Sequence, residues 1–142
     1  MNREHTEYLF KHFLSFFNPR ESFRVSLVGF GFECGDGWFE LIKELCEKLK
    51  ALQLKDFKVI QVKEKFGGLR FYYAINGKPE RVDEVDRLIN EAEGKSCRTC
   101  ETCGKPGKSE DDGWITTLCP DCRENREKSK TERGAGKQAD KK

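Results

Sequence analysis

Residues 57–75 read FKVIQVKEKFGGLRFYYAI, and this stretch decides the fold of the 142-residue chain. Two runs rich in β-branched and aromatic residues flank Gly67 and Gly68, which predicts a β-hairpin with these glycines as its two-residue turn. Because side chains alternate along a strand, one face of the hairpin is apolar and packs on the core. The predicted apolar face carries Ile60, Val62, Phe66, Leu69, Phe71, Tyr73 and Ile75.

The opposite face of this hairpin carries three cations and an aromatic ring. The glycine turn places Lys65 opposite Arg70 and Lys63 opposite Tyr72, and like charges in direct opposition destabilise a strand pair unless an anion lies nearby. The face is therefore either a solvated surface paired with acids of a neighbouring helix, or a platform for nucleic acid or an acidic protein. Glu64 falls on the apolar face, where it reaches solvent near the sheet end, pairs with a cation, or is a buried acid with a raised pKa.

Upstream of the hairpin, the sequence predicts two helices. Residues 5–17 (HTEYLFKHFLSFF) space their apolar residues for a helix that Asn18 and Pro19 end. Residues 26–30 follow as a short strand or an extended linker. Asp36 is the expected N-cap of a second helix, whose apolar stripe runs over residues 38–52.

Downstream of the hairpin, residues 78–93 predict a third helix, with Pro79 in its first turn and Gly94 at its end. We therefore expect an α+β domain over residues 1–95, with helices packed on a small sheet built around the hairpin. Residues 124–142 are charged and poor in apolar side chains, which predicts one or two turns of helix followed by a disordered tail.

The chain has seven cysteines, five of them in its C-terminal third. Close CxxC pairs in a chain without a secretory signal are typical of metal ligands or redox sites, so the alternatives to a metal site are a redox dithiol pair or free thiols. The spacing fits a zinc ribbon over residues 96–123 in two registers, whose first pair is Cys97/Cys100 or Cys100/Cys103. Gly104 favours the second, because glycine allows the tight turn that directs backbone N–H groups at the thiolates. The predicted ligands of one structural zinc ion are Cys100, Cys103, Cys119 and Cys122.

Four thiolates complete a zinc tetrahedron and leave no position for water, so the predicted ion stabilises the fold and does not catalyse. The sequence has no GxSxG, Walker, HExxH or Rossmann motif, and we expect no enzyme. Glu33, Asp36 and Glu40, near His5 or His12, could form an acid–base or metal cluster, but helix caps and helix-dipole partners explain Asp36 and Glu40. An enzyme would have to use Glu33, Asp36 or Glu64.

Composition limits the partners. The net charge is +2 and 37% of the residues are charged, which is not the strongly basic composition of a dedicated duplex-DNA-binding protein. No apolar run approaches the length of a membrane span, and the N-terminus lacks the apolar segment of a signal peptide. We therefore expect a cytoplasmic protein without a membrane partner.

Four motifs occur together and resemble a family of small zinc-ribbon proteins of bacteria and their phages. They are residues 35–38 (GDGW), 63–72 (KEKFGGLRFY), 100–107 (CETCGKPG) and 113–119 (GWITTLC). The resemblance covers roughly residues 28–122. It implies a zinc ion and a phage or mobile-element origin, and it implies no particular activity.

From the resemblance and the absence of catalytic motifs, we expect a non-catalytic binding protein that acts on a host protein. Inhibition of a bacterial defence system is the most specific form of this expectation. The alternative is a nucleic-acid-binding zinc protein, such as a regulator, that uses the basic hairpin face and the charged tail. The expected binding surface comprises Lys63, Lys65, Arg70 and Tyr72.

Overall fold

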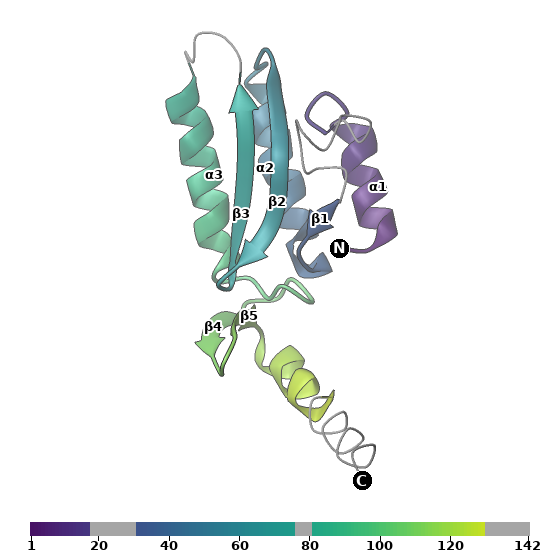
Figure 1. Cartoon of the computed structure of the whole chain (residues 1–142), viewed down its shortest axis with the longest axis vertical. Helices are drawn as coiled ribbons and strands as arrows, with labels where there is room; N and C mark the ends of the chain where they lie inside the picture. The colour runs from purple at the N-terminus through teal and green to yellow at the C-terminus, as the bar shows by residue number, and fades with distance from the viewer. Residues whose placement is uncertain (18–30, 76–80, 130–142) are drawn as a thin grey trace.

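The computed structural model describes residues 1–17, 31–75 and 81–129. A three-stranded sheet with helices lies above a two-stranded sheet and a short helix formed by residues 120–129 (Figure 1). The predicted α+β class is confirmed. The elements are α1 (Arg3–His12), β1 (Phe32–Glu33), the 3-10 turn η2 (Asp36–Trp38), α2 (Phe39–Ala51), β2 (Phe57–Lys65), β3 (Gly68–Ile75), α3 (Val82–Ser96), β4 (Lys108–Asp111) and β5 (Ile115–Leu118).

Several sequence predictions fall outside the described residues. They concern the helix end at Asn18 and Pro19, the segment 26–30, the position of Pro79, and the tail beyond residue 129. The first part of the charged tail, residues 124–129, is helical, in agreement with the one or two helical turns expected there.

The hairpin turn lies one residue earlier than predicted. Lys65 pairs with Gly68, so the two turn residues are Phe66 and Gly67, with φ of 54° and 80°. Two positive φ angles are what a type I′ turn requires, and this turn suits the twist of antiparallel strands. The shift moves Arg70 from opposite Lys65 to opposite Lys63. It also removes Phe66 from the predicted core face, and its side chain is 68% exposed.

A register shift in β2 changes a second core assignment. The pairing of β2 with β3 is irregular between Val59 and Gln61, which marks a β-bulge at Ile60. The bulge brings Val59 onto the buried face, while Ile60 is only half-buried. On the far side of the bulge, Val62 packs in the core as predicted.

The first helix is shorter than predicted. It begins at Arg3 because the Asn2 side chain accepts a hydrogen bond from the backbone N–H of His5 at 2.8 Å, which caps the helix. It ends at His12, so the prediction of a helix to residue 17 is wrong. Residues 13–17 turn instead, and their three phenylalanine rings still enter the core.

The second helix does not use Asp36 as its N-cap. Asp36 opens the 3-10 turn, and α2 begins at Phe39 without a side-chain cap. The Asp36 carboxylate instead accepts a hydrogen bond from the backbone N–H of Asn2 at 2.6 Å. The expected cap was therefore wrong, because its actual partner lies 34 residues away in the sequence.

The third helix runs through Gly94, which was predicted to end it, and continues to Ser96. A glycine with helical geometry weakens a helix without terminating it. The extra residues have a packing role, because the buried Ser96 hydroxyl accepts a hydrogen bond from the backbone N–H of Leu69 at 2.9 Å. Within the described residues, no helix combines the length and apolarity needed to cross a membrane.

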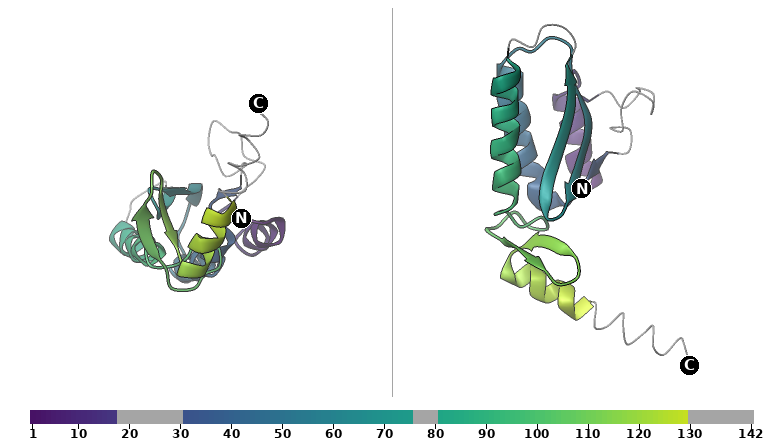
Figure 2. Two further views of the ribbon diagram at one scale, coloured as in Figure 1. Left: turned by 90° about the horizontal axis from the view of Figure 1, so that it is seen from below. Right: turned by 60° about the vertical axis from the view of Figure 1, so that its left-hand side comes forward.

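The molecule has two parts. The α+β part, residues 1–96, places β2 between β1 and β3, with α2 and α3 on one face of the sheet (Figure 2). The ribbon part, residues 97–129, contains β4, β5 and the final helix. Both views in Figure 2 show the turn between β4 and β5 projecting toward the face of the sheet that α2 and α3 leave uncovered.

Candidate metal centre

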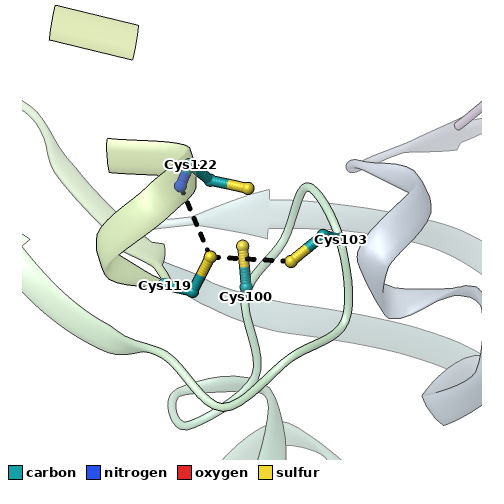
Figure 3. A group of neighbouring side chains, drawn as sticks. All are labelled: Cys100, Cys103, Cys119 and Cys122. Atoms are coloured by element: carbon teal, nitrogen blue, oxygen red, sulfur yellow. Dashed lines mark hydrogen bonds between the residues drawn. The ribbon is translucent and has the colours of Figure 1, made fainter. Parts of the chain in front are cut away.

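Four cysteine side chains converge in the ribbon part from two segments of the chain (Figure 3). Cys100 and Cys103 lie in the turns after α3, while Cys119 and Cys122 lie at the start of the final helix. Their sulfur atoms are all within 4.8 Å of one another, and those of Cys103 and Cys119 are 3.6 Å apart. Sulfurs about 2.3 Å from a tetrahedral ion would be about 3.8 Å apart, so the thiols already have the spacing of a metal site.

The fold brings together the four predicted ligands and leaves Cys97 out of the cluster. Cys97 follows α3 directly and its side chain is exposed. Gly104 has a φ of +83°, the left-handed conformation expected of the residue after the first pair. Its N–H donates to the Cys100 carbonyl at 2.9 Å, which closes the turn around the first pair of thiols.

Backbone groups prepare the thiols for a cation. Burial opposes ionisation of Cys100, but hydrogen bonds from the N–H groups of Cys119, Cys103 and Thr102 together lower its pKa to about 7. Burial and the neighbouring thiols raise the pKa of Cys122. A positive ion shared by the four sulfurs would favour their ionised forms.

The GDGW segment fixes the first pair of cysteines against the α+β part. The Gly37 N–H donates to the Glu101 carbonyl at 2.7 Å, and the Gly35 N–H donates to the Glu101 carboxylate at 2.8 Å. A Cβ atom on Gly37 would lie 2.1 Å from the Cys100 carbonyl oxygen, so only glycine allows this approach. Burial is the main cause that raises the pKa of Glu101, which lies inside this contact.

Two further contacts complete the seam, our name for the contact between the two parts. The indole N–H of the fully buried Trp38 donates to the Thr99 carbonyl at 2.9 Å. The buried Thr117 hydroxyl donates to the Gly67 carbonyl at 2.6 Å and also lies 2.6 Å from the Ser109 hydroxyl. The ribbon part therefore touches the turn of the β2–β3 hairpin as well as the GDGW segment.

The predicted binding residues share one face of β2 and β3, which we call the hairpin face. The four predicted residues stay on the same face although the turn is shifted. The pairing of β2 with β3 moves by two residues, and side chains alternate with a period of two. Lys63 lies opposite Arg70, and its ammonium group is 5.9 Å from the centre of the Tyr72 ring. The neighbouring β1 residue, Glu33, is in register with Lys63. Among the described residues, none of the cations Lys63, Lys65 and Arg70 forms an ion pair. The sequence offered the alternative that acids of a neighbouring helix neutralise this face, and no such ion pair is found in the described part of the chain.

The remaining acids and histidines make structural contacts. Asp36 accepts from Asn2 and lies 3.1 Å from Nδ1 of His5, and these groups lower its pKa, Asn2 most strongly. The Glu64 carboxylate accepts a hydrogen bond from the Gly67 N–H at 2.8 Å, so it caps the hairpin turn at the sheet end. His12 contacts the backbone carbonyl of its own helix one turn earlier.

Sequence reasoning missed the residues of the seam. Glu101 and Thr117 connect positions that lie far apart along the chain, and no local pattern distinguishes them. The paired glycines of GDGW were the available signal, because two glycines around one acid suggest a close backbone approach. Sequence reasoning also missed the exposure of Phe66 and of Trp114, which is 66% exposed.

No family model, curated protein or solved structure matches this chain. The likeness to zinc-ribbon proteins of bacteria and phages therefore stays a prediction from four motifs.

Proposed function

We propose that this protein is a non-catalytic, zinc-stabilised binding protein whose hairpin face engages an acidic surface on a host protein. The observation that supports this most directly is the group of three cations, Lys63, Lys65 and Arg70, without ion pairs in the described part of the chain. Beside them lies the exposed ring of Tyr72. Arginine and tyrosine are among the residues that dominate binding energy at protein interfaces.

Zinc is the metal that the donor set favours. Four thiolates in a tetrahedral arrangement suit zinc or iron, and CxxC pairs of this spacing are typical of structural zinc. Cys100, Cys103, Cys119 and Cys122 would hold the ion and leave it no open position. The ion would stabilise the ribbon part, and through the seam it would fix the hairpin turn.

The host-directed role is the more specific half of the proposal. It rests on the motif likeness to bacterial and phage proteins, which suggests a phage or mobile-element origin. For a protein encoded by a phage or mobile element, a binding face without a catalytic motif is consistent with an inhibitor of a host defence system. The cations and the exposed Tyr72 ring of the hairpin face also suit single-stranded nucleic acid, because bases stack on exposed rings. A nucleic-acid-binding regulator is therefore the second candidate.

The test is an affinity capture from bacterial lysate, with and without nuclease treatment. We expect the wild-type protein to retain a partner protein after nuclease treatment. The double variant Lys63→Glu/Arg70→Glu should lose that partner while keeping its zinc and its thermal midpoint.

The matched control is Lys11→Glu/Lys55→Glu, which makes the same charge change on exposed lysines outside β2 and β3. It should bind like wild type. A partner that disappears with nuclease, together with salt-dependent binding of a labelled oligonucleotide, would favour the second candidate.

A further inference from the structure

Two large apolar side chains are exposed beside the seam. Phe66 is 68% exposed and Trp114 is 66% exposed. Phe66 precedes Gly67 and Trp114 precedes Ile115, and these two neighbours lie close together across the seam. A Cβ atom on Gly67 would lie 3.1 Å from the Ile115 Cγ2 atom. Exposed aromatic residues that gather at one place mark interaction sites more often than isolated ones do.

The two rings can reach one partner. The hairpin turn carries Phe66, and Trp114 belongs to the ribbon tip, residues 111–114, which comprises the last residue of β4 and the turn before β5. Figure 2 shows the ribbon tip projecting on the same side of the molecule as the hairpin face. A standard interface buries about 800 Å² on each partner, which is enough to include the hairpin face, the turn and the ribbon tip.

The charges on this surface differ between its two ends. The hairpin face is basic, and the Lys65 ammonium group lies 5.5 Å from the centre of the Phe66 ring. The ribbon tip instead contains Asp111 and Asp112, next to Trp114. A phosphate backbone is negative throughout, so it would be attracted at one end and repelled at the other. A protein surface can match both signs, which favours a protein partner over a nucleic acid.

The partner must be recognised by side chains and not by strand addition at the nearby sheet edge. On β3, the edge strand, the Leu69 N–H is bonded to the Ser96 hydroxyl at 2.9 Å. The Phe71 N–H is bonded to the Glu93 carboxylate at 3.1 Å. These two donors are occupied by α3, which blocks that part of the edge against another strand.

We infer that the binding surface extends from the hairpin face across the seam to the ribbon tip, and that Phe66 and Trp114 are its central anchors. Its partner is a protein with an acidic patch opposite the hairpin face, basic groups opposite the ribbon tip, and apolar sockets for the two rings. This inference rests on the proposed function and adds the chemistry of the partner.

The experiment uses the protein that wild type captures after nuclease treatment, identified by mass spectrometry and purified. Trp114→Ala and Phe66→Ala should each weaken its binding about 30-fold or more, as truncated interface anchors do. Asp112→Lys should weaken binding about tenfold, because it places a cation against basic groups. The control is Leu14→Ala, which removes an equally exposed apolar side chain, 63% exposed, and should change nothing.

Zinc content and thermal midpoint show that each variant is folded. Binding that is lost in Lys63→Glu/Arg70→Glu but unchanged in Trp114→Ala and Phe66→Ala overturns this inference and leaves the proposed function standing. Capture of no protein after nuclease treatment overturns both. Tight binding of a twenty-nucleotide oligothymidylate that quenches Trp114 fluorescence overturns the inference in favour of nucleic acid. Sedimentation as a dimer that Trp114→Ala dissociates overturns it in favour of a second copy.

Discussion

The two parts of this molecule are held together by different means. The α+β part buries a continuous apolar core, in which Trp38, Ile42, Leu49 and Val62 have no exposed surface. The apolar cluster that the ribbon part buries is small and comprises Cys100, Leu118 and Cys119, with Cys122 against it. Apolar burial contributes about 25 cal/mol for each square ångström, so we expect the first part to fold on its core and the second to depend on the metal proposed for its cysteine cluster.

Under the proposed function, a metal ion in the ribbon part can affect the hairpin face from a distance. Gly67 lies in the turn of the hairpin that carries the basic residues, and its carbonyl accepts a hydrogen bond from Thr117 of the ribbon. An ion that fixes the ribbon therefore fixes one end of the hairpin face.

The largest effect is expected from a metal ligand. Cys100→Ser should abolish zinc binding, which in isolated zinc-finger peptides amounts to about 10–16 kcal/mol, and should unfold the ribbon part. Cys97→Ser removes a thiol three residues away that lies outside the cluster, and should retain one zinc per chain. Metal content measured by plasma mass spectrometry distinguishes the two variants. Loss of zinc from Cys97→Ser would contradict the ligand set.

The two tryptophans separate core from surface. Trp38→Ala empties a fully buried site and removes the donor to Thr99, so it should destabilise the α+β part by about 3–5 kcal/mol. Trp114→Ala should change stability by no more than about 0.5 kcal/mol, because its side chain is exposed. Urea unfolding followed by circular dichroism measures both. Equal losses of unfolding free energy in the two variants would contradict the distinction between a buried tryptophan in the core and an exposed one in the ribbon part.

Two glycines test the seam. Gly37→Ala places a Cβ atom 2.1 Å from the Cys100 carbonyl oxygen, and should cost about 1–3 kcal/mol and weaken zinc binding. Gly94→Ala meets nothing within 4 Å inside α3 and should stabilise the protein by about 0.5–1 kcal/mol. Thermal unfolding and competition with a zinc-binding dye give the two quantities. A Gly37→Ala variant with unchanged stability and unchanged zinc affinity would contradict the close backbone approach at the seam.

The smallest effect is expected at Asp36. The pKa of Asp36 is lowered in the fold, first by the Asn2 N–H and then by His5, so its contribution to stability is present above the unfolded pKa of about 4. That contribution is lost as the pH falls through the lowered value. Asp36→Asn should therefore be less stable than wild type at pH 6, and the difference should shrink below pH 4. Urea midpoints between pH 3 and pH 7 measure it, and a constant difference would contradict the pairing.

Local patterns predicted most of the elements and the four cysteines that cluster, because both depend on spacing along the chain. The hairpin was expected from its two β-rich runs, but its turn was misplaced because Phe66 adopts a positive φ that glycine adopts more readily. The four predicted residues of the hairpin face still lie on one face of the sheet, since a shift of two positions preserves the alternation of side chains.

Long-range contacts could not be predicted in this way. Asp36 was taken for a helix cap because such a role is local, whereas its partners come from the start of the chain. Glu101 and Thr117 gain their roles only when the ribbon meets the α+β part. The exposure of Phe66 and Trp114 is likewise a property of the assembled surface, and aromatic residues in an apolar run would otherwise be placed in the core.

Hydrogen exchange with and without a zinc chelator tests most directly whether the metal holds one part and the core holds the other. After chelation, backbone amides in residues 97–118 should lose protection, while those of α2 and the first half of β2 should keep theirs, and added zinc should restore the difference. Equal loss of protection in both parts, or no loss in the ribbon part, would contradict that division.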